Sequence, residues 1–237
     1  ARLMAERGAR VLVLERATEF RDRIRGEVLV PWGVAEATRL GFDALLRPVA
    51  HALVRWDIAV GGTTVLSRDI GDAGGLGLPV LTYYHPAMQA ILLNAAADAG
   101  AEVRRGARVT SVQPGHRATV TFDHEGGTHE VVARLVLGAD GRGSAVRSWG
   151  GFAARRDPER RLFAGVMFED MRAPDDILYS GFLPGTGLMT YVFPQGNGRV
   201  RSYVGFQTGT GVERLQGAGD IARFVETALQ IGVPPEW

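Results

Sequence analysis

The chain has 237 residues, 46% hydrophobic and 22% charged, which is enough apolar material for one large domain or two small ones with a buried core. Its 27 basic residues balance 26 acidic ones, which argues against a nucleic-acid partner or an anionic membrane surface. The absence of cysteine excludes disulfides, thiolate metal sites and cysteine nucleophiles. Because no apolar stretch reaches the roughly 18 residues of a membrane-spanning helix, we expect a globular cytoplasmic protein without an integral membrane segment.

The first residues predict the second half of a dinucleotide-binding βαβ unit. Residues 1–9 are expected to end a helix that Gly8 stops, and the apolar run 11–14 to form a buried parallel strand ending at Glu15. In such units an acidic side chain at this point accepts hydrogen bonds from the adenosine ribose, and a solvated glutamate is the alternative. The glycine-rich turn of the unit would precede residue 1, so we expect the native polypeptide to extend upstream.

An arginine-rich segment over residues 21–29 follows this strand. A guanidinium can hold a phosphate or a carboxylate with two hydrogen bonds, so Arg23 and Arg25 are candidates to bind an anionic cofactor. Solvated surface arginines are the alternative. Pro31 then predicts the start of an amphipathic helix over residues 32–40.

Hydrophobic periodicity predicts the remaining elements. Before residue 138 we expect a Gly-Gly hairpin between strands 53–60 and 63–70, a glycine-rich loop at 71–78, a helix at 86–99, and strands of a β-meander at 101–104, 107–113, 117–124 and 129–137. After residue 160 we expect a sheet of strands 161–168, 177–183, 187–193 and 199–206, covered by a helix at 220–231.

The segment 135–147 predicts a ligand-binding turn. A buried strand at 135–137 leads into Gly-Ala-Asp-Gly and then into a helix that begins near Ser144. Small residues let the backbone approach a phosphate-bearing ligand, and the first N–H groups of a helix attract anions. Asp140 could accept hydrogen bonds from ligand hydroxyls. An isolated Asp-Gly pair would indicate only a tight turn, but the whole pattern is specific.

Four segments follow one another along the chain: VLVLER, RIRGE, HPAMQAILLNAAADAGAEV with RVTSVQP, and VLGADGRGSAVR. In this order they resemble the group A flavoprotein monooxygenases, typified by para-hydroxybenzoate hydroxylase. The resemblance covers residues 1 to about 150. It implies a mixed α/β fold with two domains. Residues 1–160 would form a partial Rossmann-like FAD-binding domain with an inserted β-meander. Residues 161–237, together with part of 50–80, would form an antiparallel-sheet substrate domain. The family's downstream Gly-Asp motif is expected after Trp237.

The same resemblance implies a set of cofactor-binding residues, which are Glu15, Arg16, Arg23, Arg25, Gln89, Val109, Asp140 and Gly141. His85 departs from the pattern, because the family usually has arginine there. In this family NAD(P)H reduces the FAD, which forms a peroxyflavin with dioxygen and oxygenates an electron-rich substrate. The cofactor carries that chemistry, so no particular catalytic side chain is predicted.

The last predicted sheet carries aromatic and methionine side chains at alternate positions. The candidates to contact an apolar, aromatic or polycyclic substrate are Met189, Tyr191, Phe193 and Tyr203. Ordinary core packing is the alternative for each of them. Two other functions remain open, a non-catalytic flavin- or ligand-binding remnant and another flavin oxidoreductase of the same fold, such as an epoxidase or a reductase.

Overall fold

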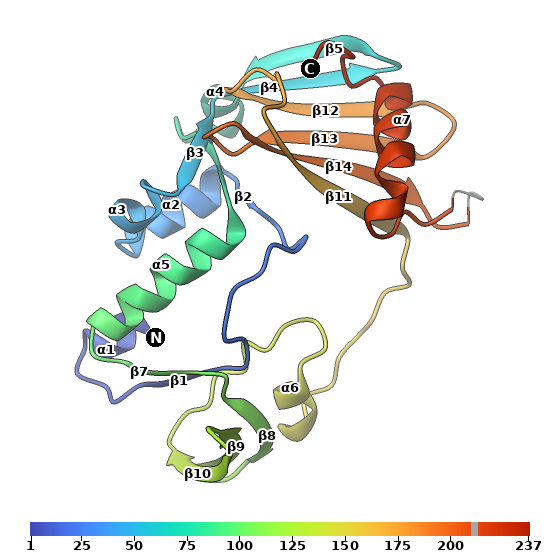
Figure 1. Cartoon of the computed structure of the whole chain (residues 1–237). Helices are drawn as coiled ribbons and strands as arrows, with labels where there is room; N and C mark the ends of the chain where they lie inside the picture. Colours follow the sequence, from blue (N-terminus) through green and yellow to red (C-terminus); the bar gives the residue numbers. More distant parts are fainter. Residues whose placement is uncertain (210–212) are drawn as a thin grey trace. The chain divides into compact units, whose positions relative to one another are not determined.

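The computed structural model describes residues 1–209 and 213–237, and these divide into two compact units (Figure 1). The first unit combines residues 1–21 with 92–157, and the second combines 22–91 with 158–237. The fold is mixed α/β with several sheets, as predicted. Which part binds a cofactor and which a substrate stays a prediction. None of the described helices is both long enough and apolar enough to cross a membrane.

The first unit holds a parallel strand pair and an antiparallel meander. Its elements are α1 (Arg2–Ala5), β1 (Leu12–Glu15), β7 (Glu102–Arg105), β8 (Arg108–Gln113), β9 (Ala118–His124), β10 (Gly127–Ala133) and α6 (Ala145–Trp149). The order β10-β9-β8 confirms the meander for three of its four predicted strands. The strand predicted at 101–104 is β7, which lies outside the meander because it pairs in parallel with β1. The β1 side chains are half-buried instead of buried on both faces, because β7 is the only strand beside β1 in the described residues.

The strand predicted at 135–137 does not form, and that prediction was wrong. Strand β10 ends at Ala133, and the side chains of Leu135 and Leu137 are 63% and 72% exposed. An apolar run becomes a buried strand only where a neighbouring strand supplies backbone hydrogen bonds. No strand within residues 1–209 or 213–237 pairs with this segment.

The second unit is built on a six-stranded sheet in the order β11-β14-β13-β12-β4-β5 (Figure 1). The strands are β4 (Arg55–Val60), β5 (Thr63–Asp69), β11 (Arg161–Glu169), β12 (Ile177–Leu183), β13 (Leu188–Pro194) and β14 (Arg199–Gln207). Helix α7 (Ile221–Ile231), which follows the short 3-10 turn η1 (Ala218–Asp220), covers one face of this sheet (Figure 1). Its buried Phe224, Ala228 and Ile231 pack with Val192 and Val204. This apolar contact forms the core on one face of the sheet.

A smaller sheet in the order β2-β6-β3 completes the second unit. The remaining elements are β2 (Val28–Leu29), α2 (Pro31–Arg39), α3 (Asp43–Leu46), β3 (Ala50–Leu53), α4 (Ile70–Gly74), β6 (Val80–Tyr83) and α5 (His85–Asp98). Pro31 starts α2 as predicted, but the glycine-rich loop expected at 71–78 begins as helix α4. The Asp69 carboxylate caps α4 by accepting the Asp72 N–H at 3.1 Å, and the left-handed Gly75 ends it.

Candidate functional site

The Asp140 carboxylate organises its own loop in the first unit. It accepts hydrogen bonds from the backbone N–H groups of Ala145 at 2.7 Å and Val146 at 3.1 Å, and from the Ser144 hydroxyl. Desolvation alone would raise the pKa of Asp140, but these hydrogen bonds outweigh it and lower the pKa. The carboxylate therefore stays ionised and holds the start of α6.

Two positions of this loop favour glycine, one because of a close contact and one because of a positive φ. A Cβ at Gly138 would lie 2.8 Å from the side chain of Val146, so only glycine lets the loop pack this closely against α6. Gly141 has φ +86°, and a Cβ there would meet nothing within 4 Å. The space beside the Gly141 backbone is therefore open, and the Asp140 carboxylate uses much of its acceptor capacity within the protein. Whether the two residues contact a ligand stays a prediction.

The other first-unit candidates lie on or just after strands. Glu15 ends β1, and its Oε1 accepts the Ala17 N–H at 2.7 Å, which leaves Oε2 to accept from a ribose hydroxyl. Arg16 is exposed and Val109 is half-buried on β8. Whether Glu15, Arg16 and Val109 contact a cofactor stays a prediction.

The second unit contains the arginine loop, which we define as residues 22–27. The side chains of Arg23 and Arg25 are exposed, and neither forms an ion pair within the described residues. Both are available to an anion, in keeping with their predicted role. Gln89 is half-buried on α5, and its role at a cofactor stays a prediction.

His85, at the start of α5, is half-buried, and its Nδ1 atom is buried without a hydrogen-bond partner. Burial lowers the pKa of His85, and the positive charge of Arg25 lowers it further, against an opposing effect of Asp22. The imidazole is therefore held neutral. A buried nitrogen without a partner is costly in a folded protein, and a bound ligand could satisfy it.

Replacing His85 by glutamine is expected to flatten the acid side of the stability profile. The pKa of His85 in the folded state lies below the ordinary value of 6.5. As the pH falls below 6.5, the imidazole is therefore protonated in the unfolded chain before it is protonated in the folded chain. Stability is then lost on acidification in the wild type and retained in His85→Gln. Urea unfolding at about pH 7.5 and about pH 5.5 measures the difference. The exposed His116, changed to glutamine, is the control, and equal pH dependence in all three proteins would contradict the expectation.

An aromatic row follows the sheet face opposite α7. Tyr191 lies at its centre, with its ring 5.9 Å from Phe193, 6.2 Å from Phe163 and 6.4 Å from Phe182. Cross-strand register places Tyr203 directly opposite Tyr191 and confirms the predicted common face. Whether this row contacts a substrate stays a prediction.

The four substrate candidates differ in the exposure of their side chains to solvent and in the contacts that these side chains make. Tyr191 is half-buried, whereas Met189, two residues before it on β13, is only 3% exposed. Phe193 packs against a second core formed by Leu53, Ile70, Val80 and Leu178, so part of its surface is structural. The Tyr203 hydroxyl donates to the Glu27 carboxylate. Tyr191 is therefore the candidate most able to meet a ligand.

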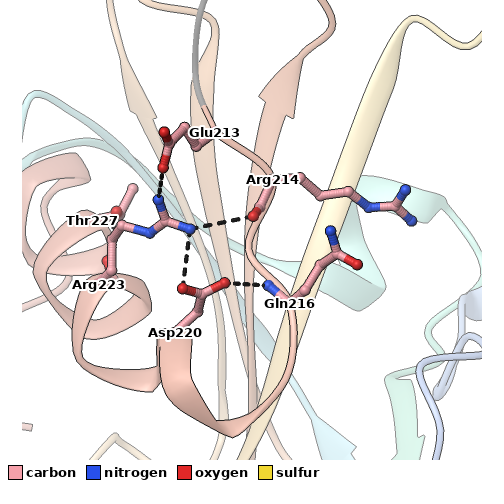
Figure 2. A network of polar contacts seen from close by, with 6 residues as sticks. All are labelled: Glu213, Arg214, Gln216, Asp220, Arg223 and Thr227. Carbon is pink, nitrogen blue, oxygen red and sulfur yellow. Dashed lines mark hydrogen bonds and ion pairs between the residues drawn. The ribbon is translucent and has the colours of Figure 1, made fainter.

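A cavity of about 270 Å³ runs along the edge strand β11. Phe163 lines it and thereby links it to the aromatic row, and the segment 214–217 forms its other side. Figure 2 shows what holds this segment: Arg223 of α7 pairs with Glu213 and lies 3.1 Å from Asp220, whose carboxylate accepts the Gln216 N–H at 2.6 Å. The Arg214 guanidinium extends away from these contacts (Figure 2).

The structure also shows a buried ionic cluster that the sequence analysis missed. Arg201 on β14 is 3% exposed, and its Nε lies 3.0 Å from Oε1 of Glu27, which is 1% exposed. The same guanidinium pairs with Asp22. Burial raises the pKa of Glu27, although the contacts with Tyr203 and Arg201 favour its ionised form. Burial, together with the hydrogen bond to Glu27, also raises the pKa of Tyr203.

The sequence of this chain matches a known protein family. The sequence model of the FAD binding domain matches residues 1–229. The chain belongs to this family. The predicted FAD-binding family is therefore confirmed.

Solved structures of monooxygenases share the fold of this FAD binding domain. PqsL from P. aeruginosa in complex with 2-aminobenzoylacetate is 20% identical, with a TM-score of 0.75, over 99% of this chain and 64% of PqsL. p-Nitrophenol 4-monooxygenase PnpA from Pseudomonas putida DLL-E4 is 18% identical, with a TM-score of 0.79, over 100% of this chain and 60% of PnpA. Aklavinone-11 hydroxylase, in a ternary complex with FAD and aklavinone, is 22% identical, with a TM-score of 0.72, over 100% of this chain and 48% of the hydroxylase.

The chain is also similar to a protein named as a reductase. Digeranylgeranylglycerophospholipid reductase 1 from Methanococcoides burtonii is 27% identical over 212 residues, which are 85% of this chain and 49% of the reductase. The chain therefore spans about half the length of this relative.

The residues present fit an FAD group. Exposed guanidiniums at Arg23 and Arg25 suit a pyrophosphate, and the free Oε2 of Glu15 suits a ribose. The buried, unpartnered Nδ1 of His85 marks a polar position that a ligand could complete. Glu15 belongs to the first unit, and Arg23, Arg25 and His85 belong to the second.

Proposed function

We propose that this chain is part of an FAD-dependent monooxygenase that uses NAD(P)H and dioxygen to oxygenate an apolar, aromatic or polycyclic small molecule. The observation that carries the proposal is the aromatic row centred on Tyr191, in a chain of the FAD binding domain family. Bound FAD would supply the electron transfer and the oxygen chemistry. The protein would then have to bind, orient and shield the reactants.

The side chains of the chain suit those tasks. Arg23 and Arg25 offer charge-assisted hydrogen bonds to an anionic cofactor, and Glu15 offers an acceptor. The rings of Phe163, Phe182 and Tyr191 offer flat apolar contact to an aromatic substrate and exclude water. PqsL and aklavinone-11 hydroxylase have aromatic or polycyclic ligands in their structures, which supports this substrate class.

Replacing Arg25 by alanine is expected to weaken FAD binding by about tenfold to a hundredfold, because a charge-assisted hydrogen bond contributes about 1.5–3 kcal/mol. Asp140→Ala is expected to weaken it as well, by loosening the start of α6. Flavin fluorescence titration of the purified protein measures both affinities. Arg21→Ala, an exposed arginine just before the arginine loop, is the matched control. Wild-type affinity in both variants would remove these residues from the cofactor site.

An absorbance spectrum with NAD(P)H oxidation assays tests the function itself. Flavin bands with NAD(P)H oxidation stimulated by phenols or fused-ring aromatics would support the monooxygenase. Flavin bands without turnover would favour the non-catalytic binder, and no flavin bands would refute the proposal.

The M. burtonii relative favours a second candidate, a flavin-dependent reductase that acts on a lipid-like substrate. Both candidates need the same cofactor and an apolar substrate surface. Isotopically labelled dioxygen separates them, because a monooxygenase transfers the label to its product and a reductase consumes no dioxygen.

A further inference from the structure

Arg201 is connected to both ends of the arginine loop. Its guanidinium pairs with Asp22 at the first residue of the loop and with Glu27 at the last. Beside it on β14, Tyr203 donates its hydroxyl to the same Glu27 carboxylate. One strand of the six-stranded sheet therefore contacts the loop at both of its ends.

The middle of the loop also packs on this sheet face. A Cβ at Gly165 of β11 would lie 3.1 Å from the Ile24 side chain, so the missing side chain leaves room for Ile24. Arg23 and Arg25 alternate with Asp22 and Ile24 and are exposed. The contacts to the sheet thus come from Asp22, Ile24 and Glu27, and the guanidiniums of Arg23 and Arg25 form no ion pair within the described residues.

The charge of Arg201 is unusual for its position. The neighbouring residues across the sheet are Met167 on β11 and Phe193 on β13, so the register surrounds Arg201 with apolar side chains. A buried charge is expensive unless an opposite charge accompanies it, and an apolar residue would pack there without that cost. In the described residues its ionic partners are Asp22 and Glu27, both in the arginine loop. The buried charge of Arg201 therefore serves to hold this loop.

We propose that Arg201 is a positioning residue that fastens both ends of the arginine loop to the six-stranded sheet and so presents Arg23 and Arg25 to an anionic cofactor. The fastening stands on the contacts alone, and the presentation to a cofactor rests on the proposed function. Glu27 and Tyr203 complete the attachment at one end, and Asp22 completes it at the other.

Limited trypsin digestion of the purified protein without FAD tests the fastening, because trypsin cleaves after the loop arginines only when the loop opens. In Arg201→Gln, cleavage after Arg23 and Arg25 should accelerate about tenfold, equivalent to about 1.4 kcal/mol in opening free energy. Cleavage after Arg142, in the exposed loop of the first unit, is the internal reference and should not change. An unchanged ratio of the two rates would overturn the proposal.

Further variants keep the test decisive if Arg201→Gln does not fold. Asp22 is 33% exposed, so Asp22→Asn should fold and release one end of the loop, with a smaller acceleration. Arg201→Lys keeps the charge but lacks the fork that meets two carboxylates, so it should restore only part of the protection. Ser202→Ala, at the next residue of β14, is the matched control and should digest like the wild type. Wild-type digestion of Asp22→Asn would count against the attachment.

Flavin titration separates the two parts of the proposal. In Asp22→Asn, which leaves the buried Arg201–Glu27 pair in place, FAD affinity should fall up to about tenfold while the urea midpoint stays close to that of Ser202→Ala. If the wild type binds no FAD, the proposed function fails, and the digestion comparison still decides the fastening. Faster digestion with unchanged FAD affinity would overturn the positioning role.

Discussion

Alanine at Gly232 is expected to lower the free energy of unfolding by about 3 kcal/mol or more, because two costs combine at this position. Gly232 ends helix α7 with φ +117°, where an L side chain is strained. An added Cβ would also lie 2.6 Å from the backbone nitrogen of Gly62, in the hairpin between β4 and β5. Backbone cannot yield as a flexible side chain can, so helix and hairpin would have to separate.

The position of Gly232 is fixed from a second side, since its carbonyl accepts the hydroxyl of the buried Tyr179. Chemical unfolding of Gly232→Ala measures the loss. Gly185→Ala in the same unit is the control, because Gly185 also has a positive φ of +75° but open space around its Cβ position. The control should lose only about 1 kcal/mol of conformational strain. Equal losses in the two variants would show that the close approach to Gly62 contributes nothing.

Local patterns were sufficient to predict most of the second unit. A strand-like segment between proline and glycine turns placed β12 at residues 177–183, the bounds that the structure gives. Alternation put Tyr191 and Tyr203 on one face, where the register pairs them. These predictions succeeded because the period of a strand is a property of the strand itself and needs no knowledge of its partners.

Features that depend on distant partners were not predicted. The apolar residues of 135–137 read as a buried strand, yet no described strand pairs with them, and Leu137 is exposed. Glu27 and Tyr203 lie 176 residues apart in sequence, so no local pattern joins them. One signal was available, because Arg201 shares its strand face with Tyr203 and a charge on an inward face calls for a partner. The sequence could not name that partner.

Replacing Tyr191 by aspartate is expected to reduce kcat/KM for substrate-stimulated NAD(P)H oxidation by at least about a hundredfold, equivalent to about 2.7 kcal/mol. Tyr191 contacts three other rings of the aromatic row and is half-buried. A carboxylate there would lose its water when an apolar substrate binds, and it would remove the central ring. Met189→Asp is a poorer test, because Met189 is only 3% exposed and a buried charge would unfold the sheet.

Steady-state assays with phenols and fused-ring aromatics, together with the flavin spectrum, separate a substrate effect from a cofactor effect. Tyr191→Phe keeps the ring and should retain most of the activity. Val65→Asp adds the same charge at a 60% exposed position of β5 in the same sheet, and it should behave like the wild type. A selective loss in Tyr191→Asp with intact flavin bands would place the substrate on the aromatic row. Flavin loss without a selective effect on substrate would instead make the row part of the structural support of the cofactor domain.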